Sequence, residues 1–323
     1  MPSTQDRNDD YLLGYRRDEA QENNRLNHQH DAIKHAILEG HLVHPSIPTV
    51  EITKAIADLG CGTGVWLDDV KNTLFPGNDT GPRLVGFDLN VEAFNKTPAP
   101  GVQLIKQDCT KPFDDSYNGT FDLVNIRGLA YALSVEGFSL MINNAIRLLR
   151  PGGYLQWLET ETRLFKAYPA TAKMSEALAA INSEREQRDL APYLPHVMLR
   201  ELLSHNLEPS VTLASSDLLR ILHFNLLPGG LSRSEGSETS ALNDCFSDIV
   251  LETVKLLLNA SLVRAKSQDD HATKEIQPQN QSRLEEIQAL MDYIDEVRKS
   301  SEVKLGGVFP HVIAQKLDDA LPK

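Results

Sequence analysis

The most informative segment of the sequence is ADLGCGTG, residues 57–64. It ends a short apolar run that begins at Ala55, and its alternate glycines allow a sharp turn that brings the backbone close to a ligand. An acid, Asp58, precedes the first glycine by two positions. The spacing is G-x-G-x-G and differs from the G-x-G-x-x-G turn of dinucleotide-binding proteins, which argues against a nicotinamide dehydrogenase.

Two further acids end later apolar runs. Asp88 lies in LVGFDLN, one helix and one strand after the glycine turn, and Asp108 lies in IKQDCTKPF. Acids that end successive parallel strands lie along one edge of a sheet, where open α/β sheets bind ligands. At that edge, Asp88 can accept hydrogen bonds from both hydroxyls of a ribose. The pattern therefore indicates a nucleoside-containing ligand.

The apolar runs between residues 55 and 153 alternate with segments long enough for helices or crossover connections. This alternation predicts an α/β open sheet with parallel strands and helices on both faces. The runs are AIADLG, RLVGFDLN, VQLIKQD, FDLVNIRG and GYLQWLE.

The flanking regions have a different texture. Helical patterns predict an N-terminal helix from about residue 11 to 42 and further helices near 171–189, 198–204, 243–265 and 283–298, and GGVFPHVIAQKL predicts a late strand. The resulting division is a disordered tail 1–10, an N-terminal helical cap 11–48, a core 49–161, a mainly helical insertion with part of the sheet 162–305, and a final strand 306–323 that completes the core.

These motifs resemble the class I S-adenosylmethionine (SAM)-dependent methyltransferase family over about residues 55–160. The glycine turn with its acid, the ribose acid, the Asp-Cys pair at 108–109, FDLVNIRG and LLRPGGYLQWLE follow one another in the family's order. The resemblance implies a Rossmann-like sheet with an N-terminal helical segment and a helical cap. It also implies SAM as cofactor, S-adenosylhomocysteine as product, and no metal.

By this resemblance, Asp58 acts on the positively charged amino group of SAM, Asp88 binds the ribose, and Asp108 contacts the adenine amino group beside Cys109. Two alternatives stay open: Asp58 only caps the glycine turn, or Asp108 is an N-cap. Both cysteines, at 61 and 109, are better explained by packing than as nucleophiles. The predicted cofactor-binding set is Asp58, Gly60, Cys61, Gly62, Gly64, Asp88, Leu89, Asp108, Cys109, Asn125, Arg127, Tyr11, Arg25 and Gln29.

Residues outside the core resemble fungal secondary-metabolite methyltransferases, the group with gliotoxin-type N-methyltransferases and regulator-like relatives. The resemblance rests on YLLGYRRDE at 11–19, RLNHQH at 25–30 and LVHP at 42–45. It implies that the N-terminal helix lies over the cofactor, with Tyr11, Arg25 and Gln29 near the cofactor carboxylate or the substrate. It also implies that the residues Asn125 and Arg127 line the pocket.

The expected function is O- or N-methylation of an aromatic or alkaloid-like natural product. Methyl transfer depends mainly on alignment of the acceptor, and a histidine base would help a weakly acidic one. His311 in the late strand is the first candidate, against the alternative that it faces solvent, and His30 and His223 are weaker candidates. Possible pocket walls are Phe165, Tyr168, Tyr193, Phe224 and Phe246.

Two other functions remain open: a SAM-binding regulatory protein, and an enzyme of this fold that catalyses a non-methylating step. The net charge of −13, from 32 basic and 45 acidic residues, disfavours nucleic acid and an anionic membrane as partners. Three cysteines without metal-type spacing, and no apolar signal segment, favour the cytoplasm. His28 and His30 diverge on a helix, which argues against a metal site. We expect a small-molecule partner and a monomer or homodimer.

Overall fold

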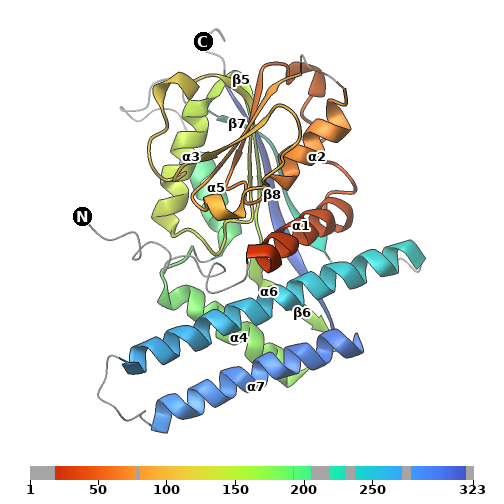
Figure 1. Cartoon of the computed structure of the whole chain (residues 1–323), viewed down its shortest axis with the longest axis vertical. Helices are drawn as coiled ribbons and strands as arrows, with labels where there is room; N and C mark the ends of the chain where they lie inside the picture. Colours follow the sequence, from red (N-terminus) through yellow and green to blue (C-terminus); the bar gives the residue numbers. More distant parts are fainter. Residues whose placement is uncertain are drawn as a thin grey trace.

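The computed structural model describes residues 19–77, 81–191, 193–204, 219–229, 237–270 and 278–317. They form an α/β sheet with a layer of long helices at one end (Figure 1). The elements, in chain order, are α1 (Glu19–Ala36), η1 (Thr49–Glu51), β1 (Ala55–Leu59), α2 (Val65–Leu74), β2 (Arg83–Asp88), η2 (Val91–Ala93), β3 (Val102–Lys106), η3 (Asp115–Tyr117), β4 (Phe121–Arg127), α3 (Val135–Leu148), β5 (Leu149–Leu158), β6 (Glu161–Tyr168), α4 (Ala172–Gln187), α5 (Leu194–Ser204), β7 (Leu219–Gly229), α6 (Ser237–Asp270), α7 (Pro278–Ser300) and β8 (Lys304–Lys316).

Within the described residues, the sheet has eight strands in the order β3-β2-β1-β4-β5-β8-β6, and β7 also pairs with β8. Strands β1 to β5 are parallel, and β8 is antiparallel to β5, β6 and β7. The glycine turn follows β1, and from there the chain crosses over to β2 on one side of β1. Strand β4 pairs with the other side of β1, so the strand order reverses here. This is the switch point at which open α/β sheets bind ligands.

The register shows that β6 continues β5 along one edge of β8. Leu158 of β5 pairs with His311, and Glu161 of β6 pairs with Val308 in the same register, which then shifts before Lys166 pairs with Gly306. The other edge of β8 is taken by β7. In space the order is therefore β3-β2-β1-β4-β5-β8-β7, with β6 as the far end of β5.

Apolar strands produce a core on both faces of the sheet. Strand β1 is buried at every residue, as expected for a central parallel strand covered on both sides. Helix α2 covers one face through Trp66, Leu67 and Val70. Helix α3 covers the other face through a buried stripe that includes Phe138, Met141 and Ile142.

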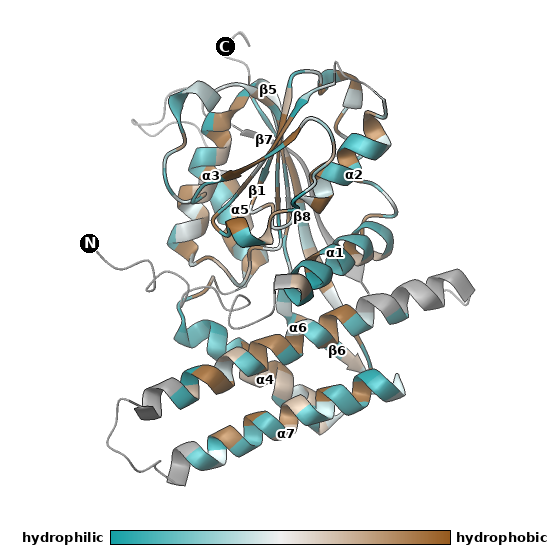
Figure 2. Cartoon of the chain, viewed as in Figure 1, coloured by the Kyte–Doolittle hydropathy of each residue, from teal (hydrophilic) through white to brown (hydrophobic). Residues whose placement is uncertain are grey.

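The long helices form a second layer at the carboxyl end of the parallel strands. Helix α6 packs against α7, α4 and α1, and β8 reaches down to α6. Figure 2 shows apolar stretches along α6 and a mainly polar surface on α1. Because α1 lies between the sheet and α6, it stands over the edge at which the glycine turn ends (Figure 1). Among the helices that the structure describes, none is long and apolar enough to cross a membrane.

The predicted α/β fold class is confirmed, and every helix expected after residue 170 is present, as α4, α5, α6 and α7. The N-terminal helix expected over about residues 11–42 is present as α1, which ends earlier, at Ala36, while residues 11–18 lie outside the described ones. The late strand is β8. The division of the chain into a core, an insertion and a final strand stays a prediction.

Candidate functional site

The glycine turn adopts the left-handed backbone that its sequence predicts. Gly60, Gly62 and Gly64 have φ angles of 71°, 55° and 83°. A Cβ atom would lie 2.6 Å from Leu129 Cδ2 at Gly60 and 2.8 Å from Leu104 Cδ2 at Gly64. Only glycine is compatible with both the backbone and the space here.

Asp88 joins the end of β2 to the glycine turn. Its Oδ2 accepts the backbone N–H of Gly62 at 2.8 Å, and its Oδ1 accepts the N–H of Asn90 at 2.8 Å. Burial raises the pKa of this carboxyl, and the backbone hydrogen bonds from Asn90 and Gly62 act in the opposite direction. The neighbouring Leu89 is 45% exposed, so a carboxylate and an apolar surface lie side by side at this edge.

Asp58 belongs to a buried polar row that crosses three strands. Asn125 Nδ2 donates to Asp58 Oδ1 at 2.8 Å, and Gln156 Nε2 donates to Asn125 Oδ1 at 2.9 Å. Gln156 also donates to Leu42 O and accepts a hydrogen bond from the N–H of His44. These two contacts fix the orientation of the Gln156 amide, and with it which side chain donates and which accepts along the row. Burial raises the pKa of Asp58 to about 7, against the hydrogen bond from Asn125.

Asn125 was expected to line the pocket, and the structure places it within this row instead, 2% exposed. The reason is the parallel pairing of β4 with β1, which sets Asn125 directly opposite Asp58. Neither Asn125 nor Arg127 is among the described residues that line the pocket considered below.

His30 connects α1 to the sheet and to α2. Its Nδ1 accepts from Arg127 Nη2 at 3.0 Å, so its Nε2 carries the proton and donates to Asp69 Oδ2 at 3.0 Å. Burial and the nearby charge of Arg127 lower the pKa of His30 to about 4. Both ring nitrogens have protein partners, which argues against His30 as a catalytic base.

Asp108 and the two cysteines have local contacts. Asp108 Oδ1 accepts from the backbone N–H of Thr110 at 3.0 Å and from its hydroxyl at 2.7 Å, which closes a local turn. No helix begins at this residue, so the structure does not place Asp108 at a helix N-cap. Burial raises the pKa of the Cys61 and Cys109 thiols well above their usual range. Both side chains are therefore neutral thiols, in keeping with packing rather than nucleophilic roles.

Helix α1 lies directly over the glycine turn. Thr63 Oγ1 donates to Asn27 Oδ1 at 2.8 Å, and the Leu26 side chain lies over Gly62, where a Cβ atom would come within 3.2 Å of it. The resemblance to fungal relatives implied this placement of the helix. Tyr11, the other residue expected there, lies outside the described residues.

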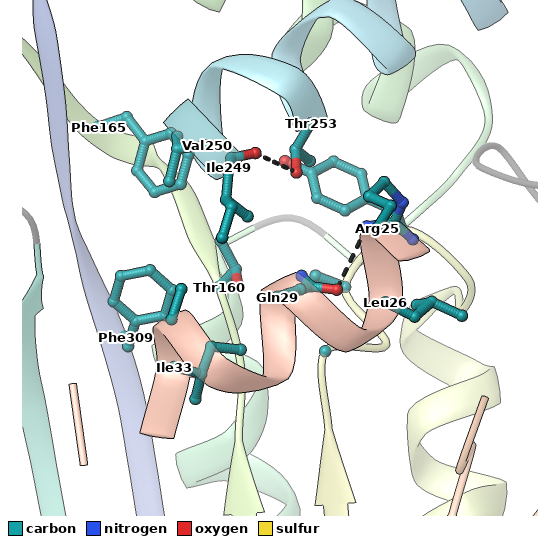
Figure 3. A pocket seen from close by; sticks show the side chains of 14 residues that line it. Arg25, Leu26, Gln29, Ile33, Thr160, Phe165, Ile249, Val250, Thr253 and Phe309 are labelled. Atoms are coloured by element: carbon teal, nitrogen blue, oxygen red, sulfur yellow. Dashed lines mark hydrogen bonds between the residues drawn. The ribbon is translucent and has the colours of Figure 1, made fainter. Parts of the chain in front are cut away.

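A narrow pocket of about 60 Å³ lies between α1, α6 and the sheet. Figure 3 shows Phe165 and Phe309 on one side, Ile33 and Gln29 of α1 on another, and Ile249 of α6 across from them. Phe165 and Phe309 have ring centroids 6.4 Å apart. The described lining residues are Arg25, Leu26, Gln29, Ala32, Ile33, Gly128, Ala130, Tyr131, Thr160, Phe165, Ile249, Val250, Thr253 and Phe309.

Arg25 and Gln29, both expected near cofactor or substrate, line this pocket. Arg25 is 2% exposed and is paired with Glu22 through two hydrogen bonds, at 3.0 and 2.5 Å. Its third donor, Nη1, bonds Gln29 Oε1 at 3.2 Å. Because that oxygen is held by Arg25, Gln29 offers its amide N–H groups to other partners (Figure 3).

Phe165 is the one predicted aromatic wall residue that the structure places in the described lining. Tyr168 and Tyr193 are 55% and 44% exposed and lie outside it. The side chains of Phe224 and Phe246 lie outside the described residues.

His311 takes neither of the two positions expected for it. It is 1% exposed, so it does not face solvent, and it is absent from the described lining of the pocket. Its ring packs edge-on against His44, with centroids 5.3 Å apart. The loop that contains His44 covers this part of β8, which strand periodicity does not reveal. The side chain of His223, on β7, lies outside the described residues.

The sequence reasoning missed Glu159, a buried acid at the end of β5. Its Oε1 accepts from Leu129 N and Trp157 Nε1, both at 3.1 Å, and its Oε2 accepts from Ala130 N at 3.0 Å. The acid at the end of a buried apolar run, in QWLE, was the available signal. The sequence prediction assigned a binding role to the acids at the ends of the first three strands only.

Comparison with known proteins agrees with this geometry. Residues 56–153 match the family model described as "Methyltransferase domain". Together with the strand order and the glycine turn, this match identifies a class I methyltransferase domain, whose cofactor is SAM.

The curated proteins to which the chain is similar include methyltransferases from fungi. The chain is 29% identical to the methyltransferase grgD of a Penicillium species, over 57% of this chain and 65% of that protein. It is 30% identical to the N-methyltransferase gliN of Aspergillus fumigatus, over 58% of this chain and 60% of that protein. The matches thus span less than two thirds of these relatives. A solved structure, a putative methyltransferase from Bacillus halodurans, has 12% identity, a TM-score of 0.44, and covers 83% of this chain and 94% of that chain.

The residues at the sheet edge fit SAM. The glycines leave the backbone of the turn without side chains of its own at three positions, and Asp88 places carboxylate oxygens at the end of β2 beside the exposed Leu89. Asp88 would hold the ribose and Leu89 would cover the base. Within the described ranges, no three histidine, cysteine or acidic side chains are arranged to hold a metal ion.

Proposed function

We propose that this chain transfers the methyl group of SAM to an oxygen or nitrogen of an uncharged, partly aromatic natural product. The carrying observation is that the loop 128–131 borders both sites. Gly128, Ala130 and Tyr131 line the pocket, and Leu129 packs against Gly60 of the glycine turn. An acceptor in the pocket would therefore lie next to a cofactor held at the turn.

SAM supplies the methyl group when bound, and the chain itself supplies binding and alignment. Asp88 and the glycine turn would hold the cofactor, while the pocket walls orient the acceptor and exclude water. Alignment of this kind provides a large share of the rate of a group transfer. No histidine is among the lining residues that the structure describes, so we propose that alignment, without a histidine base, carries the reaction.

The charge of the pocket supports an uncharged acceptor. Arg25 is the one charged side chain in the described lining, and Glu22 neutralises it through two hydrogen bonds. A carboxylate or ammonium group entering beside Phe165 and Phe309 would lose hydration without a matching partner there. The Gln29 amide instead suits a carbonyl or another neutral hydrogen-bond acceptor.

We further propose that the protein acts in the cytoplasm as a monomer or homodimer, on a small molecule and not on nucleic acid or a membrane. The excess of 45 acidic over 32 basic residues supports the exclusion of anionic polymers and surfaces.

The first test is titration of SAM into the protein by calorimetry, with Asp88→Ala as the variant and Glu136→Ala, an exposed acid on α3, as the matched control. We expect binding by wild type and control, weakened at least 100-fold in Asp88→Ala, since two hydrogen bonds to a charged group contribute about 3 kcal/mol or more. Absence of SAM binding by the wild type would overturn the proposal.

The second test is methyl transfer, measured by mass spectrometry over matched acceptor pairs. Each pair differs only in charge, for example an aromatic amide against the corresponding carboxylate, or a hydroxyindole against its aminoalkyl derivative. We expect methylation of neutral members. Retained SAM binding without transfer to any neutral acceptor would favour a SAM-binding regulatory protein, the group to which the Coprinopsis cinerea relative laeA is assigned by its name.

A further inference from the structure

Glu159 is a buried acid with a complete set of hydrogen-bond donors around it. It is 1% exposed and follows the last residue of β5, and its backbone N–H donates to Pro310 O of β8 at 3.0 Å. Its carboxylate accepts the backbone N–H groups of Leu129 and Ala130 and the indole N–H of Trp157. Three N–H donors directed at one carboxyl group favour its ionised form, which offers acceptors in every direction and adds no donor of its own.

The two backbone donors belong to the loop 128–131, which follows β4. Gly128 has a φ of 72°, so this loop turns sharply as it leaves the strand. Ala130 lines the pocket, and the Leu129 side chain contacts the position of Gly60. The carboxylate therefore holds a segment that, like α1, borders both the glycine turn and the pocket.

We propose that ionised Glu159 is a positioning residue, which fixes loop 128–131 between the cofactor and the acceptor and releases it when protonated. This inference rests on the proposed function for its effect on catalysis. Its structural half, the coupling of the loop to the charge of Glu159, is independent of it.

Protonation would change the loop because a carboxylic acid brings a donor of its own. The added O–H would meet the N–H groups of Leu129 or Ala130, or the Trp157 indole, and one of these buried donors would lose its acceptor. A buried unsatisfied donor destabilises its local structure, so the loop would shift to find another partner.

The surroundings of Glu159 place this change in the neutral range. Burial raises the pKa of Glu159 to about 7, against the hydrogen bonds from Trp157, Leu129 and Ala130 and the positive charge of Arg185 on α4. The titratable Tyr131 of the same loop stays neutral there, because burial raises its pKa above its usual value. On β8 the neighbouring titratable residue is His311, which the experiment must separate from Glu159.

The indole of Trp157 reports on Glu159 directly. The chain has two tryptophans, and Trp66 donates to Leu42 O, away from Glu159. In a Trp66→Phe background, Trp157 fluorescence should change between pH 5.5 and 8.5 with a midpoint near 7. The change should disappear in Glu159→Gln and persist in His311→Gln. Neither SAM nor an acceptor is needed.

The effect on the site is measured by calorimetric titration of SAM over the same pH range. We expect wild-type affinity to fall about tenfold from pH 8.5 to 5.5, and Glu159→Gln to bind about tenfold more weakly at every pH, without this dependence. Glu136→Gln is the control and should behave as wild type.

A wild type without a Trp157 transition would overturn the proposal, and so would a transition that persists in Glu159→Gln. Because the first of these outcomes needs only the Trp66→Phe protein, it stands even where Glu159→Gln does not fold. A Trp157 transition together with absent SAM binding would leave the loop coupling in place and overturn the proposed function instead.

Discussion

A comparison of Gly64 with Gly101 separates two reasons for glycine in the turn. One is the free-energy cost of a left-handed φ for any other residue, and the other is the lack of space for a side chain. Gly64 stands at the start of α2 with φ 83°. Gly101, before β3, has nearly the same φ, 88°, but lies exposed with nothing within 4 Å of an added Cβ atom. Replacing each glycine by alanine imposes the same backbone strain, and only Gly64→Ala adds a methyl group within the glycine turn, against Leu104.

The structure sets the size of both effects. A non-glycine residue in the left-handed region costs about 1–2 kcal/mol, so Gly101→Ala should lower the free energy of unfolding by that amount. In Gly64→Ala the new Cβ lies 2.8 Å from Leu104 Cδ2. Overpacking of this kind adds about 1–3 kcal/mol, reduced to the lower end because the end of the Leu104 side chain can move. We expect a total loss of about 2–3 kcal/mol.

Urea unfolding followed by tryptophan fluorescence measures the two free energies, and calorimetry measures SAM affinity. Gly101→Ala should bind SAM as wild type does, whereas Gly64→Ala should bind at least tenfold more weakly, the factor that about 1.4 kcal/mol corresponds to. Equal SAM affinity in both variants would refute the placement of the cofactor at this turn. Equal losses of stability would refute the contact with Leu104.

Three further outcomes follow from buried groups. Burial and Arg127 lower the pKa of His30 to about 4, below its value of 6.5 in the unfolded chain. The free energy of unfolding should therefore fall by about 3 kcal/mol as pH drops from 6.5 to 4. Urea unfolding of His30→Gln should lack this pH dependence. Asp122 is 0% exposed and accepts hydrogen bonds from two backbone N–H groups and from the guanidinium of Arg150. Asp122→Asn should therefore lower the free energy of unfolding by about 3 kcal/mol and leave SAM affinity, measured by calorimetry, unchanged. An unchanged free energy of unfolding would contradict the pairing of Asp122 with Arg150. At Gly307 an added Cβ would lie 2.3 Å from the Phe165 ring. Gly307→Ala should therefore displace that ring, raise the KM for the acceptor at least tenfold and leave SAM binding intact. An unaltered KM would show that Phe165 does not contact the acceptor.

The sequence predicts the fold well because its signals are local. Each parallel strand is a short apolar run followed by its own turn or helix, and the glycine turn has the left-handed φ angles that its composition demands. The antiparallel strand β8 was expected, but its neighbours were not. Its pairing with β5, β6 and β7 joins residues far apart in the chain, and apolar runs carry no information about register.

The same distinction explains the site. Asp88 lies where the strand pattern puts it, since its partner Gly62 belongs to the adjacent turn. Asn125 and Glu159 differ, because their roles depend on which strand or loop lies opposite them. His311 shows the limit most clearly: its strand was predicted, while the loop that buries it comes from the other end of the chain.

Helix α1 then explains how one short segment can serve two sites. Side chains three or four residues apart share a helix face, so Asn27 and His30 face the glycine turn and Arg127, while Arg25 and Gln29 face the pocket. Any displacement of this helix changes both faces together. The ion pair of Arg25 with Glu22 would keep the pocket wall neutral through such a displacement, because both residues belong to the same helix.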